Sequence, residues 1–86
     1  MEAFPPALQA LAADERGNWE EAHRLSQLDP GKDGAWVHAY LHRKEGDATN
    51  AAYWYAQAGQ AVCGESLETE WRSVSTALLE KFKDQP

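Results

Sequence analysis

The chain has few of the features that mark several common classes of protein. It has a single cysteine, Cys63, which excludes an intramolecular disulfide framework. No apolar run approaches the roughly 20 residues that a membrane-spanning helix needs. The N-terminal residues also lack a basic segment followed by an apolar one, so we expect no signal peptide. These absences favour a cytoplasmic location and no membrane partner.

Positive charge is also scarce. The 8 Lys and Arg stand against 14 Asp and Glu, which gives a net charge of −6. A nucleic-acid backbone or an anionic membrane attracts clustered basic residues, so we expect neither as a partner. The sequence also lacks a glycine-rich phosphate loop, a Ser/His/Asp grouping and a dinucleotide fingerprint. We therefore predict that the protein is not an enzyme and needs no cofactor.

Helical patterns dominate what is present. No segment alternates apolar and polar residues as a strand does, and β-branched residues are few. Apolar residues recur at spacings of three and four, and 86 residues suit one domain. We predict an all-α domain over residues 1–86, with five helices. They cover about 6–16, 19–28, the stretch between Asp33 and Gly46, 48–58, and a last helix that follows Ser66.

The turns between these helices have recognisable chemistry. Gly17-Asn18 and Gly46-Asp47 each combine a glycine stop with a side chain that caps the next helix. Asp33 and Ser66 are the expected caps of the third and fifth helices. The two glycine turns lie 29 residues apart, within the range of stacked helix–turn–helix repeats.

The segments around both turns resemble tetratricopeptide repeats. They read G-N-W-E-E-A at 17–22 and G-D-A-T-N-A-A-Y-W-Y-A-Q-A-G at 46–59, and the second is also similar to the Sel-type variant. The resemblance covers about residues 6–59. It implies two stacked helical hairpins, with the last helix as a terminal cap. Residues 38–55 also resemble a small uncharacterised family, which implies no function.

The third helix carries the strongest candidates for functional residues. His38 and His42 lie four residues apart, so both side chains project from one face, and Glu45 extends that face. Two imidazoles one turn apart can bind a divalent transition metal, and His23 on the second helix could join them. The alternative is that these histidines are solvated or hydrogen-bonded residues of the polar face.

A protein-interaction module is the first functional hypothesis. In stacked helical hairpins the first helix of each pair lines the concave surface, which would place His38, His42 and Arg43 on a groove. Tyr53 cannot share the buried stripe of its helix with Trp54 and Tyr55, so we expect it to cover a second neighbour or face water. Tyr and Arg are favoured interface anchors. The expected partner is a protein, a peptide or a second copy; metal or small-ligand binding is the alternative.

Overall fold

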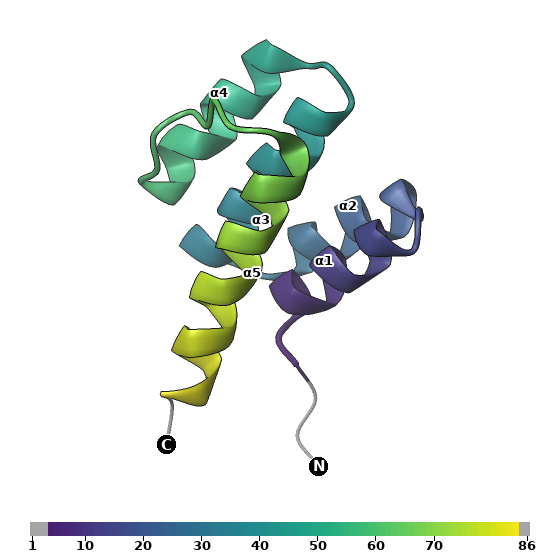
Figure 1. The fold of residues 1–86 in the computed structure, drawn as a ribbon, viewed down its shortest axis with the longest axis vertical. Helices are drawn as coiled ribbons and strands as arrows, with labels where there is room; N and C mark the ends of the chain where they lie inside the picture. The colour runs from purple at the N-terminus through teal and green to yellow at the C-terminus, as the bar shows by residue number, and fades with distance from the viewer. Residues whose placement is uncertain (1–3, 85–86) are drawn as a thin grey trace.

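The computed structural model describes residues 4–84. In this range the chain folds into five α-helices. Helices α1 and α2 make one hairpin, α3 and α4 make a second, and α2 packs against α3 (Figure 1). The predicted all-α fold is confirmed. No helix in the described part of the chain combines the length and the apolar character that crossing a bilayer requires. The bounds are α1 Pro6–Glu15, α2 Trp19–Leu28, α3 Lys32–Lys44, α4 Ala48–Ala58 and α5 Leu67–Lys83.

The two hairpin turns have the same structure. Gly17 and Gly46 adopt φ values of 81° and 90°, a region that glycine enters without steric cost. In both turns the amides of the glycine and the next residue bond back to carbonyls of the preceding helix. Asn18 and Asp47 then accept from the backbone N–H three residues later, at 3.2 and 3.1 Å. These two caps, and the cap at Ser66, are where the sequence predicted them.

Replacing the cap of α4 is expected to destabilise the protein modestly. Asp47→Ala removes the only side-chain acceptor that this helix start has in the described structure, so the free energy of unfolding should fall by about 1 kcal/mol. Asp47→Asn keeps the acceptor oxygen and should retain most of the stability. Urea denaturation of the three proteins measures the difference, and an unchanged midpoint for Asp47→Ala would contradict the role of the cap.

The start of α3 differs from the prediction. Asp33 is not its N-cap, because the helix begins at Lys32 after Gly31, whose φ of 93° reverses the chain two residues before Asp33. The end of α2 consequently lies very close to the first turn of α3. A Cβ built on Gly34 would stand 1.9 Å from the carbonyl oxygen of Asp29, so only glycine fits at this crossing.

Helix α5 crosses the two hairpins instead of extending their stack beyond α4. It packs against α1 and α3 and runs in front of α3 in Figure 1. Its buried residues Val74 and Leu78 join the core, and the Trp71 indole N–H donates to the carbonyl of Leu11 at 3.0 Å. This is the surface that the first helices of the hairpins were expected to leave open. The apolar stripe of α5 covers most of it, so that a pocket of about 410 Å³ between α1, α3 and α5 takes the place of the groove.

The core is centred on α3, which contacts all four other helices. Val37, Tyr40 and Leu41 are buried there, and Tyr55 of α4 is equally enclosed. The four tryptophans are half-buried and pack against the edges of the core. A helix with neighbours on every side buries its polar face as well as its apolar one, and this decides the environment of the histidines.

Candidate metal-binding site

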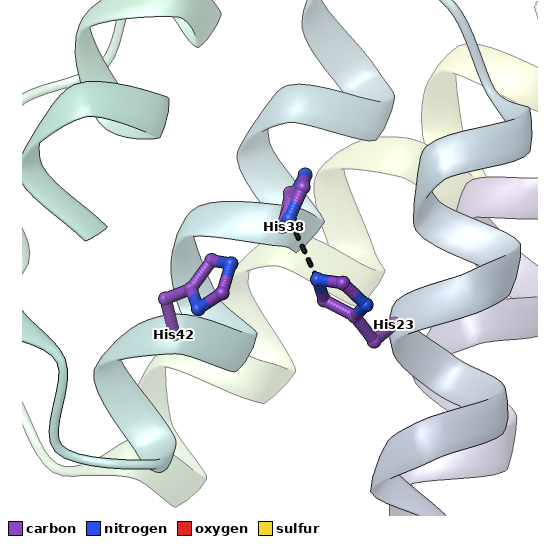
Figure 2. Close-up of side chains that lie close together, drawn as sticks. All are labelled: His23, His38 and His42. Carbon is purple, nitrogen blue, oxygen red and sulfur yellow. Dashed lines mark hydrogen bonds between the residues drawn. The ribbon is translucent and has the colours of Figure 1, made fainter. Parts of the chain in front are cut away.

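The three histidines of the chain lie together between the two hairpins. His23 comes from α2, and His38 and His42 come from successive turns of α3 (Figure 2). One ring nitrogen of each lies within 4.8 Å of one from each of the others. The Nε2 atoms of His23 and His38 are 2.9 Å apart. The predicted association of His23 with the pair on α3 is therefore present in the structure.

The histidines are not a solvated face. His38 and His42 are only 5% and 7% exposed, whereas His23 is half-buried. Solvation and an open groove are wrong for this pair, because α2 and α4 pack on either side of it. The hydrogen bonds of His38 to His23 and of His42 to Glu45 agree with the hydrogen-bonded alternative. Three buried or half-buried imidazoles in one place are chemically unusual, since each brings polar nitrogens that need partners.

Two tryptophans fix the orientation of the outer rings. The Trp19 ring stacks on His23 with centroids 4.9 Å apart and an interplanar angle of 11°, and the Trp54 ring stacks on His38 at 4.1 Å and 20°. The Trp19 indole N–H is itself held by the carbonyl of Leu41 at 2.9 Å. Stacking of this kind limits ring rotation, so the imidazoles are held in position before any ligand arrives.

Glu45 supports the cluster from outside. Its carboxylate lies 2.7 Å from Nδ1 of His42, which places the proton on that nitrogen and leaves the lone pair on Nε2. Metal-binding histidines commonly carry such a carboxylate on the nitrogen that faces away from the metal. The sequence suggested Glu45 as a ligand, and the structure gives it this orienting position.

Burial keeps His38 and His23 neutral. Burial, followed by the nearby rings of His23 and His42, lowers the pKa of His38 to about 4. The pKa of His23 is lowered chiefly by burial and then by His42. Neutral imidazole is the form that binds metal ions, so these two histidines need little or no deprotonation at pH 7.

This depressed pKa predicts that the metal-free protein is less stable in mild acid. The unfolded chain gains a proton at His38 near pH 6.5, whereas the folded chain resists it down to about pH 4. The stabilisation is therefore complete above pH 6.5 and is lost as the pH falls through this window, by about 1–3 kcal/mol. Urea denaturation in chelator between pH 7 and pH 5 measures it. In His38→Asn the free energy of unfolding should depend less on pH. An equal dependence on pH in both proteins would contradict the prediction.

The other residues expected to bind a partner lie elsewhere. Arg43 projects from α3 toward α5, where it donates to Glu70 at 2.8 Å and to the carbonyl of Glu65. Tyr53 is 56% exposed on α4 and meets the Trp54 ring edge-on at 5.1 Å. The four residues predicted as one binding surface are thus divided between an enclosed cluster, an ion pair and an exposed ring.

Sequence reasoning missed the role of the two tryptophans that flank the cluster. Trp19 lies four residues before His23 on α2, a spacing that places the two rings on one face and was available in the sequence. The stacking of Trp54 on His38 had no local signal, because it depends on how α4 packs against α3.

Comparison with known proteins identified no relative of the chain. No family model matches the chain, and no curated protein or solved structure is similar to it at a significant level. The likeness to tetratricopeptide repeats therefore stays a prediction from the sequence.

Proposed function

We propose that the protein binds one divalent transition-metal ion through His23, His38 and His42. The observation that carries the proposal is the convergence of three imidazoles, with ring nitrogens within 4.8 Å of one another, from two separate hairpins. Imidazole ligands favour Zn²⁺, Cu²⁺, Ni²⁺ and Co²⁺, whereas Mg²⁺ and Ca²⁺ prefer oxygen. The ligand set thus defines the class of ion.

The geometry requires only small movements. Zinc binds imidazole nitrogen at about 2.0–2.1 Å, so two nitrogens on a tetrahedral ion stand about 3.3 Å apart. The Nε2 atoms of His23 and His38 are 2.9 Å apart and would separate slightly, whereas His42 already offers a nitrogen within 4.8 Å of both other rings. Small shifts of α2 against α3 would accommodate this change.

Metal binding would join the two hairpins. His23 belongs to the first hairpin, and His38 and His42 belong to the second, so an ion between them bridges the α2–α3 interface. Because the ligands come together only in the folded chain, the free energy of binding would add to the free energy of unfolding.

Isothermal titration of untagged, metal-free protein with zinc and nickel tests the proposal. All three histidines of the chain are in the cluster, so no other histidine can compete. We expect one ion per chain, with binding lost or at least 100-fold weaker in His38→Ala and His42→Ala. Cys63→Ser is the matched control for a thiol ligand and should bind normally. Equal binding by wild type and His38→Ala would refute the assignment.

A second proposal is protein interaction through the surface around Tyr53. The exposure of this aromatic ring on α4 supports it. The predicted likeness to tetratricopeptide repeats supports it too, because the two hairpins of this chain have matching turns. The partner would be a cytoplasmic protein or peptide, or a second copy of the chain. Sedimentation and pull-down with Tyr53→Ala test this surface; a partner bound equally by both proteins would exclude it.

A further inference from the structure

The histidine cluster supplies three ligands and no fourth. Among the described residues, the group around the three imidazoles contains no carboxylate or thiol. Glu45 is held against Nδ1 of His42, the nitrogen that carries the proton. Cys63 instead packs against the separate cluster of Ala39, Ala51 and Tyr55. A tetrahedral zinc or cobalt ion held by three protein ligands takes its fourth from outside the protein.

Open space reaches the cluster at His38. A pocket of about 370 Å³ lies between the end of α2 and the start of α3, and His38 and Trp54 form part of its lining. The size is within the range of small-molecule sites. His38 is therefore shared between the three-imidazole group and a pocket that solvent can enter. The remaining lining comes from the end of α2 (Ser26 and Gln27), the loop that joins the hairpins (Asp29, Pro30 and Gly31) and the start of α3 (Gly34 and Ala35).

We propose that the ion bound by these histidines keeps an exchangeable fourth position, which small anions reach through the pocket beside His38. The inference rests on the proposed metal binding. A water molecule occupies the position in the absence of other ligands, and an incoming anion replaces it as the water leaves, with no change in the oxidation state of the metal. Three histidines with a free position are typical of reactive zinc sites, whereas structural zinc sites are filled by four protein ligands. The site would thus bind small anionic ligands as well as the metal.

Cobalt-loaded protein tests the inference, because the visible absorption of Co²⁺ reports its coordination. Azide and thiocyanate are titrated into the cobalt protein. We expect saturable changes in the position and intensity of the bands between 500 and 700 nm, with one anion bound per ion. A cobalt spectrum that is unaffected by both anions would show a closed site and overturn the inference, while the metal-binding proposal would stand. Failure to bind cobalt at all would refute both.

A matched pair of variants tests whether anions reach the metal through the pocket. Gln27 lies at an exposed position of α2 and lines the pocket, so Gln27→Trp should obstruct it. Gln57 is exposed on α4 and does not line it, so Gln57→Trp is the control. We expect anion affinity to fall at least tenfold in Gln27→Trp alone, with cobalt affinity unchanged in both. Equal anion affinity in the two variants would exclude this route. Metal-dependent dimerisation with an anion-insensitive spectrum would assign the fourth ligand to a second copy and overturn the inference.

Discussion

Zinc at 100 times its dissociation constant is expected to raise the melting temperature of the metal-free protein by roughly 10–20 °C. Binding only to the folded state at this excess contributes about 2.7 kcal/mol. For a domain of 60–100 residues, each kcal/mol shifts the melting temperature by roughly 4–8 °C. The large response follows from the placement of the ligands, because His23 and the two histidines of α3 meet only when the hairpins are packed together. Calorimetry or circular dichroism with and without chelator measures the shift.

The variants around the cluster separate ligands from supporting groups. His38→Ala should remove the zinc-induced shift, whatever its own melting temperature, because two imidazoles bind far more weakly than three. Glu45→Gln should keep the shift but reduce it, since loss of a supporting carboxylate typically weakens metal affinity 10–100-fold. The zinc-induced change, not the absolute melting temperature, is the quantity to compare. If His38→Ala and the wild type rose equally with zinc, another site would be responsible.

The helices and their ends could be predicted from the sequence because local chemistry determines them. Gly17 and Gly46 take left-handed conformations, and Asn18 and Asp47 cap the next helices with their own side chains. None of these features depends on distant residues. The one boundary that was wrong, at Asp33, depends on the close approach of α2 to Gly34, which no local pattern records.

The environment of the histidines could not be predicted in the same way. The spacing of His38 and His42 correctly places them on one face of α3, but whether that face meets water depends on which helices cover it. Here α2 brings His23 against them, and α4 brings Trp54. The path of α5 across α1 and α3 is equally non-local, and it removes the groove expected from stacked hairpins.

Two buried carboxylates show how α5 and α1 are held against the central helix. Asp14 of α1 accepts from the hydroxyl of Tyr40 and from Lys44, both at 2.9 Å. Glu70 of α5 likewise accepts from a tyrosine hydroxyl and from a basic residue of α3. Both carboxylates are almost fully buried, at 4% and 3% exposed. Each carboxylate therefore satisfies a tyrosine and a cation, which secures its helix in one position.

Removal of the Glu70 carboxylate is expected to lower the free energy of unfolding more than any other substitution proposed for this protein. Glu70→Ala leaves the half-buried guanidinium of Arg43 without its ion-pair partner and the buried hydroxyl of Tyr55 without its acceptor. Leaving the buried hydroxyl without an acceptor costs about 1–3 kcal/mol, and the loss of the partly buried ion pair adds to this cost. Burial and the bond to Glu70 both raise the pKa of Tyr55, so its hydroxyl remains a donor that needs this acceptor.

Glu68 provides the matched control on the same helix. It is exposed and pairs with Arg72 one turn away, so Glu68→Ala should cost no more than about 0.5 kcal/mol. Glu70→Gln keeps an acceptor for Tyr55 but loses the charge that faces Arg43, and should fall between the two. Urea denaturation gives the three free energies of unfolding. If Glu70→Ala cost as little as Glu68→Ala, the buried network would not be what holds α5 across the hairpins, and the apolar contacts of Val74 and Leu78 would carry that role alone.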